Sequence, residues 1–232
     1  MTTVHKSLTA RTCDRLRMAV IESRYAPGER LRIEEICRDL QASSGAVREA
    51  LSRLTAEGLV IAEPQRGFVV APISRRDLTD LTEVRIDIEL RCLHQSILHG
   101  DMEWEAAIIA ARHRLGSLRN AFLTPGAPEA QTWHQLHAAF HDALAAACPN
   151  RWWLRLRQQL YVQSERYRRL SGPADETGRD VHAEHEALAE AVVGRDAARA
   201  ETLMRDHLTR TTDILLGSRM PFAEDAEARS PA

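Results

Sequence analysis

The stretch from residue 27 to residue 70 constrains the fold more than any other part of this chain. It contains two short apolar stripes, each with the i, i+3, i+4, i+7 spacing of one helical face. The stripes consist of Ile33, Ile36, Cys37 and Leu40, and of Val47, Ala50, Leu51 and Leu54. Two helices joined so closely cannot lie antiparallel and must cross, and Ser43 or Ser44 can cap the second. The pattern predicts a helix-turn-helix, whose second helix is shaped to enter a DNA major groove.

A compact hairpin is predicted directly after the second helix. Gly58 is expected to end that helix, because glycine tolerates the left-handed cap conformation. Residues 59–62 and 68–71 are predicted to form two strands, with Pro64-Gln65-Arg66-Gly67 as the turn between them. The hairpin would form a wing with an arginine at its tip. The alternative is a small helical subdomain without a DNA role, but a winged helix-turn-helix is far more specific than a lone apolar stripe.

The segments PGERL, VREALSRLTAEGLV and QRGFVV resemble the DNA-binding domain of GntR-type bacterial transcription regulators, over roughly residues 8–72. Most proteins of this type begin the recognition helix with Ser-Arg-Thr-Pro, where this chain has Ser-Ser-Gly-Ala. The arginine that often reads bases in the family is therefore missing, which obscures the operator sequence. The resemblance implies a DNA-contacting set made of Ser43, Ser44, Gly45, Arg48, Arg66 and Gly67.

Length and composition fit two folded, mostly helical domains. The chain has 232 residues, of which 44% are hydrophobic and only 5% are aromatic, and this length can bury two small cores. No run of about 18 apolar residues is present, so no membrane span is expected. The N-terminus lacks the apolar core of a signal peptide. These features predict a cytoplasmic protein.

The charges are distributed unevenly along the chain. Residues 1–75 hold 12 basic and 9 acidic side chains, whereas the remainder holds 19 basic and 24 acidic side chains. A mildly basic front on an acidic body fits a DNA-binding head. Because the excess is small, the charge alone is weak support for that function.

The second half of the chain is predicted to be helical throughout. Pro72-Ile73-Ser74 marks a boundary between a winged helix-turn-helix domain over 1–73 and an all-α domain over 74–219, followed by a polar tail over 220–232. Helices are expected at about residues 75–98, 102–122, 130–147, 151–170, 178–193 and 197–217. Six such helices suggest a bundle with a central cavity. The expected fold class is therefore mainly α, with an N-terminal winged helix-turn-helix and a C-terminal helical bundle.

Four histidines share apolar helical faces in this second half: His137, His141, His185 and His207. A histidine pair at i, i+4 can bind one metal ion, whereas a lone inward histidine is usually a hydrogen-bonded core residue. Burying four unpaired imidazoles would carry a desolvation cost, which a shared metal would remove by using the ring nitrogens. The pattern favours a divalent metal site, with buried core histidines as the alternative.

Arg85 falls on the apolar face of the first helix of this half. An inward arginine needs an anionic partner. That partner could be an internal carboxylate such as Glu89, one helical turn further on, or the carboxylate of a bound ligand. The residues alone leave both possibilities open.

Residues from about 74 to 217 resemble the FCD ligand-binding domain of the FadR subgroup, through the segments LTEVRIDIEL and LHAAFHDALAAACPN. The family's metal ligands are one aspartate and three histidines, and the histidines match His141, His185 and His207. His137 stands where the aspartate usually is, so the divalent site would carry a charge of about +2 and favour zinc or nickel over manganese or magnesium. If His137 does not ligate, the site has three histidines and open positions. The resemblance also implies that Arg85 binds the effector.

These features together predict a ligand-responsive bacterial transcription regulator and not an enzyme. Two heads of a homodimer would bind an inverted repeat in double-stranded DNA, and a small carboxylate at the metal and Arg85 would change their DNA affinity. By resemblance, the expected regulator is a repressor. One alternative is a metal-dependent hydrolase with an accessory DNA-binding head, although no HExxH motif, nucleophile motif or phosphate loop is present. Another is a regulator that senses the metal itself.

Overall fold

The computed structural model describes residues 7–118, 128–175, 178–220 and 222–223. The chain divides into two compact units, one made of residues 1–75 with 221–232 and the other of residues 76–220. The two expected domains, 1–73 and 74–219, have nearly the same limits as these units. Their status as separate domains stays a prediction.

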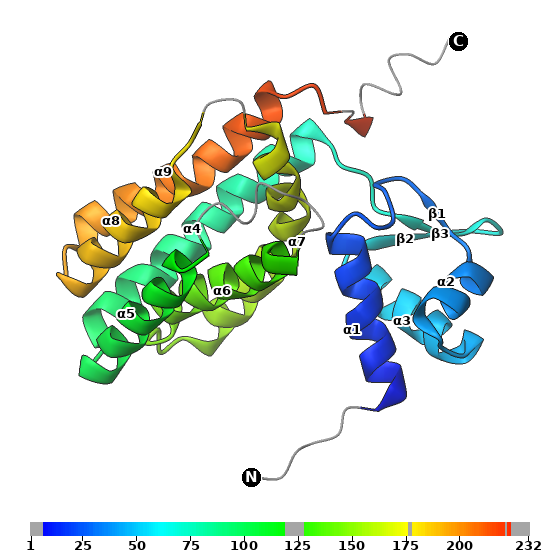
Figure 1. The fold of residues 1–232 in the computed structure, drawn as a ribbon, viewed down its shortest axis with the longest axis horizontal. Coiled ribbons are helices and arrows are strands. Elements are labelled where there is room, and N and C mark those ends of the chain that lie inside the picture. Colours follow the sequence, from blue (N-terminus) through cyan, green and yellow to red (C-terminus); the bar gives the residue numbers. More distant parts are fainter. Residues whose placement is uncertain (1–6, 119–127, 176–177, 221, 224–232) are drawn as a thin grey trace. The chain divides into compact units, whose positions relative to one another are not determined.

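The first unit is a small helical head with a three-stranded sheet (Figure 1). Its helices are α1 (Leu8–Ile21), α2 (Ile33–Leu40) and α3 (Ser44–Ala56), and its strands are β1 (Arg30–Leu31), β2 (Val60–Glu63) and β3 (Gly67–Val70). The strand order is β1-β3-β2, and both pairings are antiparallel. The core forms from the predicted apolar stripes, with Ile36, Leu51 and Leu54 fully buried. The winged helix-turn-helix is therefore confirmed.

Local chemistry explains where α3, the second helix of the helix-turn-helix, begins and ends. The Ser43 hydroxyl accepts a hydrogen bond from the Ala46 amide at 3.3 Å, which makes Ser43 the cap of α3. After α3, Gly58 adopts a φ of +74°, as the sequence predicted. The hairpin strands lie within one residue of their predicted positions. Strand β1 was not predicted, since two residues are too short to show an alternating pattern.

The second unit consists of helices, as predicted. They are α4 (Arg75–His99), α5 (Met102–Gly116), α6 (Pro128–Ala145), α7 (Arg151–Ala174), α8 (Val181–Val193) and α9 (Ala197–Gly217). Side-chain caps fix several of the starts: Asp101, Asp180 and Asp196 each accept from a backbone amide three residues on. The expectation that the second helix reaches residue 122 was wrong, because α5 ends at Gly116 and a turn follows. Residues 119–127, between α5 and α6, lie outside the described residues.

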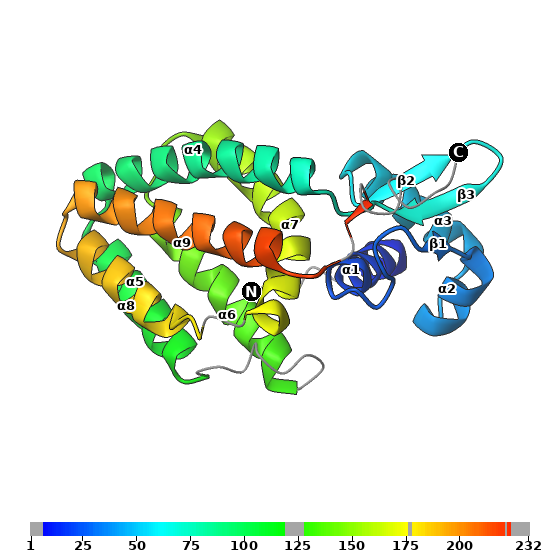
Figure 2. The same cartoon turned by 90° about the horizontal axis from the view of Figure 1, so that it is seen from above.

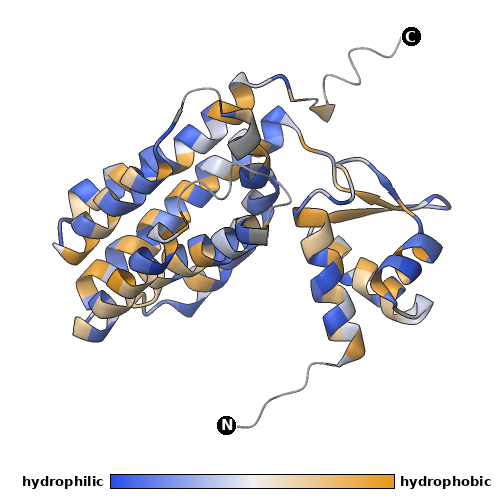
Figure 3. Cartoon of the chain, viewed as in Figure 1, coloured by the Kyte–Doolittle hydropathy of each residue, from blue (hydrophilic) through white to orange (hydrophobic). Residues whose placement is uncertain are grey.

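These helices pack around a common apolar core. Helix α9 packs against α7 and α8, and α5 packs against α6 and α8 (Figure 2). Each helix carries both apolar and polar residues (Figure 3). The core includes Trp104, Ile108, Phe140, Leu188 and Met204, each at most 6% exposed. The same core surrounds the histidines described below.

The segment after α9 differs from the expected polar tail. Phe222 is 1% exposed, and the Arg75 guanidinium lies 4.5 Å from the centroid of its ring. The Ala223 amide also donates to the Ile73 carbonyl at 2.9 Å. These two contacts hold residues 222–223 against residues 73–75. The contact between Arg75 and Phe222 is a cation–π interaction, in which the guanidinium is attracted to the face of the ring. Residues 224–232 lie outside the described part.

Among the described residues, no helix combines the length and the apolar character that a membrane span requires.

Candidate metal centre and DNA-binding surface

Helices α6, α8 and α9 bring the four predicted histidines together. His137 and His141 come from α6, His185 from α8 and His207 from α9. Their exposed fractions are 1%, 1%, 2% and 5%, respectively. One nitrogen of each lies within 4.8 Å of the others. Because metal–nitrogen bonds are about 2.0–2.1 Å long, small side-chain rotations would bring all four nitrogens within range of one ion.

Several of the imidazole nitrogens have no hydrogen-bond partner within the described chain. Both ring nitrogens of His141 and Nε2 of His185 are buried and unpaired. A buried polar atom without a partner is costly, and proteins rarely leave one. Unpaired nitrogens on two histidines of one cluster fit a bound metal ion better than a set of core histidines. The cluster therefore has the composition and spacing to bind a metal.

Two of the histidines are oriented by neighbours outside the cluster. His207 Nδ1 lies 2.8 Å from the carboxylate of Glu184, so its proton is donated there and Nε2 is left for a metal. His137 Nδ1 lies 3.4 Å from the Tyr161 hydroxyl, and its ring stacks on Trp133 at 4.9 Å between centroids. Carboxylate and hydroxyl partners of this kind orient ligating histidines in metalloproteins.

Burial holds all four imidazoles in the neutral, ligating form. Desolvation lowers the pKa of His137, His141 and His185 well below the usual histidine value, and positive neighbours add to the effect. The pKa of His207 is also lowered by burial, although the hydrogen bond to Glu184 opposes the shift. A neutral imidazole keeps a lone pair for a metal, so metal binding would not have to displace a proton at neutral pH.

Arg85 is buried, at 7% exposure, as its place on the apolar face predicted. Its Nη2 lies 3.6 Å from Glu89, the internal carboxylate considered as its partner, but its Nε has no partner among the described residues. Glu89 is bound more closely by another arginine, Arg157, at 2.7 Å. Arg85 is therefore only partly neutralised. Its guanidinium lies 5.1 Å from the centroid of the Tyr161 ring, whose hydroxyl contacts His137 of the cluster.

Helix α7 supplies buried charges that the sequence did not single out. Arg157 joins Glu89 to Asp142, each at 2.7 Å. Arg168 makes two hydrogen bonds to Glu165 and also lies 2.9 Å from Nδ1 of His134. Burial would raise the pKa of Glu165, but Arg168 lowers it to about 2. The sequence of α7 is unusually rich in arginine, but no local pattern indicates which of these arginines are buried.

The predicted DNA-contacting residues all lie on the surface of the head. Ser43, Ser44, Gly45 and Arg48 are exposed at the start of α3, and Arg66 and Gly67 are exposed in the wing. Gly45 has open space where a Cβ would be. Gly67 has a φ of +93°, which glycine adopts without strain. Two exposed arginines beside a recognition helix are suited to contacts with phosphates and base edges. Their role in binding DNA stays a prediction.

A winged helix-turn-helix joined to a helical unit with a buried cluster of metal-binding side chains defines a class of protein: a DNA-binding regulator with a sensing domain. Comparisons with known proteins agree with this assignment. Residues 8–70 match the model for bacterial regulatory proteins of the gntR family, and residues 80–210 match the FCD domain. The chain belongs to the GntR family of transcription regulators and carries an FCD effector-binding domain.

Relatives support the family along nearly the whole chain. The HTH-type transcriptional regulator BphR of Paraburkholderia xenovorans is 41% identical over 210 residues, covering 90% of this chain and 86% of BphR. The HTH-type transcriptional repressor GlaR of Escherichia coli is 34% identical, covering 86% of this chain and 92% of GlaR. The solved structure of E. coli McbR/YncC shares the fold, with a TM-score of 0.74 at 18% identity over 91% of this chain and 98% of that one.

Proposed function

We propose that this protein is a transcriptional repressor whose affinity for operator DNA is changed by a small carboxylate bound at a metal site in the FCD domain. The observation that carries the proposal is the cluster of four buried, neutral histidines beside a partly neutralised arginine, Arg85. This cluster lies in the same chain as a winged helix-turn-helix. A metal-bound ligand and a DNA-binding surface are the two elements that a ligand-responsive regulator requires.

The charge of the site supports an anionic effector. Four neutral imidazoles would leave a divalent ion with a charge of about +2, and the Arg85 Nε is free to donate. With four histidines bound, a carboxylate would take a fifth position on the metal with one oxygen and bind Arg85 with the other, since charge-assisted pairs of this kind are strong. Nitrogen-only donors favour zinc or nickel over manganese or magnesium. His137, His141, His185 and His207 are the proposed ligands.

The DNA-binding part of the proposal rests on the exposed residues of α3 and the wing. Arg48 and Arg66 would contact DNA directly, and Ser43, Ser44, Gly45 and Gly67 would allow the backbone to approach it. A homodimer with two such heads matches an inverted repeat. Repression, as opposed to activation, is proposed because the relative GlaR is named as a repressor. A protein acting on chromosomal DNA in a bacterium is placed in the cytoplasm.

Catalysis is not part of the proposal. Each of the four histidines is at most 5% exposed, so a metal there would be screened from bulk water and large substrates. A hydrolase needs an open metal position with access for water and substrate.

The test begins with selection of binding sites from a random duplex library, since the operator is unknown. The selected duplex should be an inverted repeat, and Arg48→Ala should weaken its binding by about 1–3 kcal/mol. Arg199→Ala, an exposed arginine on α9, is the matched control. Fluorescence anisotropy then measures DNA affinity with acetate, lactate, succinate, glutarate and citrate.

At least one carboxylate should weaken DNA binding by the wild type and leave Arg85→Ala unaffected. Arg91→Ala, an exposed arginine on the same helix, should respond like the wild type. If metal removal alters DNA affinity and no carboxylate does, the metal itself is the signal and the carboxylate proposal is wrong. If Arg85→Ala responds normally, Arg85 is not the effector contact.

A further inference from the structure

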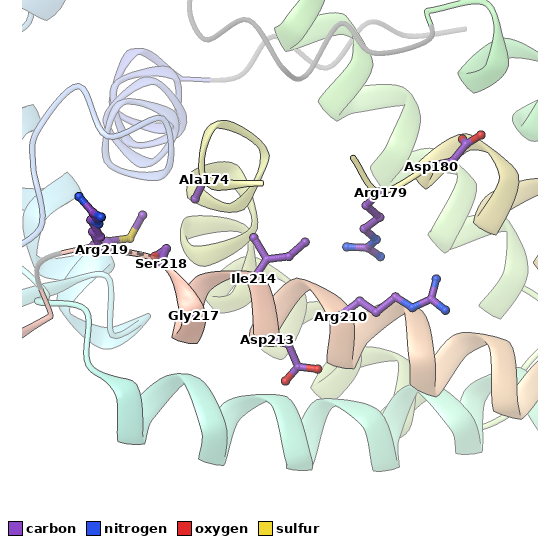
Figure 4. Close-up of a pocket in the computed structure, with 10 residues that line it drawn as sticks. Ala174, Arg179, Asp180, Arg210, Asp213, Ile214, Gly217, Ser218 and Arg219 are labelled. Atoms are coloured by element: carbon purple, nitrogen blue, oxygen red, sulfur yellow. Dashed lines mark hydrogen bonds between the residues drawn. The ribbon is translucent and has the colours of Figure 1, made fainter. Parts of the chain in front are cut away.

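A cavity of about 730 Å³ lies in the second unit beside the C-terminal end of α9. Its walls come from the last residue of α7, the segment before α8 and the last two turns of α9 with the residues that follow it (Figure 4). Its volume is in the range of small-molecule sites, about 300–1,000 Å³. None of the four clustered histidines lines it, so it is distinct from the proposed metal-centred effector site.

Arginine side chains face this cavity more directly than the aspartate side chains in its wall. Three arginines and two aspartates line it: Arg179, Arg210, Arg219, Asp180 and Asp213. In Figure 4 the Arg179 side chain points toward Ile214, whereas both aspartate side chains point away from this pair. Asp180 is also occupied as the cap of α8, because it accepts from the Ala183 amide at 2.9 Å. The interior therefore presents arginine rather than carboxylate.

One carboxylate serves two of these arginines. Glu184 accepts from Arg179 Nε and from Arg210 Nη1, each at 2.8 Å, and it also accepts from His207. Two guanidinium groups on one carboxylate leave one positive charge unmatched within this trio, and Asp180 and Asp213, whose side chains point away from Arg179 and Ile214, lie opposite in charge to Arg219. The Arg210 side chain is 58% exposed, so its remaining N–H groups are accessible. An anion would supply the missing negative charge.

Arg179 is held in place before any ligand arrives. Its side chain is 7% exposed, and it donates to the Thr211 hydroxyl at 2.9 Å and to the His207 carbonyl at 2.8 Å, in addition to Glu184. A donor fixed in this way loses little conformational entropy when a ligand binds. Beside it, Ala174, Ile214 and Met220 provide an apolar wall. One side of the cavity is therefore lined by arginine and the other by apolar side chains.

We propose that this cavity is a second ligand site, which takes a small amphipathic anion: a carboxylate or sulfonate on an apolar body. The charged group lies against Arg179 and Arg210, and the apolar body lies against Ile214 and Met220. The cavity shares no lining residue with the histidine cluster, although Glu184 connects the two by accepting from both Arg179 and His207.

The test uses 1-anilinonaphthalene-8-sulfonate, a fluorescent sulfonate with an aromatic body, titrated into the purified full-length protein. Binding should saturate at about one probe per chain. Arg210→Ala should weaken it by about tenfold or more, which is the loss expected for one charge-assisted hydrogen bond. Ile214→Trp should abolish it by filling the cavity. Arg205→Ala, an exposed arginine on the same helix, should bind the probe like the wild type.

A neutral analogue separates anion recognition from general apolar binding. N-phenyl-1-naphthylamine lacks the sulfonate and should bind about tenfold more weakly or worse. Equal affinity for both probes would overturn the anion assignment. Unchanged binding by Ile214→Trp, with a wild-type circular dichroism spectrum, would overturn the location. If Ile214→Trp does not fold, Arg210→Ala at the exposed rim decides the question, because wild-type probe affinity in that variant would refute the site.

Discussion

His207 Nδ1 and the Glu184 carboxylate lie 2.8 Å apart, and both side chains are largely buried. The contact fixes which nitrogen of His207 faces the cluster, because a proton held on Nδ1 leaves the lone pair on Nε2. Arg179 and His207 together hold the pKa of Glu184 well below its usual range, although burial alone would raise it. Glu184 is therefore ionised at neutral pH, and it can hold the His207 ring in one tautomer.

Glu184→Gln should weaken metal binding by about 10- to 100-fold, the usual cost of losing the carboxylate partner of a ligating histidine. The variant keeps the shape of the side chain but cannot stabilise the Nδ1 proton as well. Competition with a fluorescent zinc chelator measures the change. Glu190→Gln, exposed on the same helix, is the control. Wild-type zinc affinity in Glu184→Gln would show that this contact has no part in binding a metal.

His137→Asp should retain a metal site but change its preference. The substitution replaces one nitrogen donor with a carboxylate, which lowers the site charge to about +1 and suits manganese or magnesium better. Relative affinities for zinc and manganese, measured by competition in the wild type and the variant, report the change. The zinc-to-manganese ratio should fall in the variant. An unchanged ratio would indicate that His137 is not a ligand and that the ion is held by three histidines.

Arg157→Leu should destabilise the protein by about 3–5 kcal/mol, the cost of leaving a buried charge without its partner. The stranded group is Glu89, which is 2% exposed and accepts from Arg157 at 2.7 Å. Arg155→Ala on the exposed side of the same helix should cost at most about 1 kcal/mol. Urea unfolding followed by circular dichroism measures both variants. Equal effects would mean that Arg85 alone neutralises Glu89.

His134 should make stability depend on pH. Burial and the neighbouring Arg168 lower its pKa to about 3 in the folded protein, whereas an unfolded histidine titrates near 6.5. Between these values the unfolded chain binds a proton that the folded protein does not, so stability is fully present above pH 6.5 and falls as the pH decreases toward 3. Each pH unit in this window costs about 1.4 kcal/mol.

The matched variant is His134→Gln, which keeps a hydrogen-bond acceptor for Arg168 but does not titrate. Unfolding free energies at pH 7 and pH 5 give the slope for each protein. The wild type should lose more stability than the variant, by about 1.4 kcal/mol for each pH unit below 6.5. Parallel pH profiles would show that His134 is protonated in the folded protein.

Local sequence patterns were sufficient to predict most of the fold and the histidine cluster. Helical periodicity is a property of neighbouring residues, so the stripes in α6, α8 and α9 identified inward histidines without knowledge of the packing. The cap at Ser43 and the left-handed Gly58 also follow from adjacent residues. The choice between a metal site and four core histidines was open from sequence, and the unpaired nitrogens of His141 favour the metal.

Partners that meet only in the folded chain were not predictable. Glu184 and His207 are far apart in sequence, and the arginines of α7 carry no local mark of which face is buried. Glu89, which the sequence offered as one possible partner of Arg85, is bound more closely by Arg157. Phe222 was assigned to a polar tail because its neighbours are polar, yet it is buried beside Arg75. Such pairings depend on tertiary contacts.

Metal content of the purified protein shows whether the histidine cluster binds a metal. Wild type and His141→Ala are purified without chelator, dialysed and measured by plasma mass spectrometry. We expect about one zinc or nickel ion per chain in the wild type and its loss in His141→Ala, with both proteins folded by circular dichroism. No metal in the wild type, even after incubation with zinc or nickel salts, would refute the metal site and make the four histidines core residues.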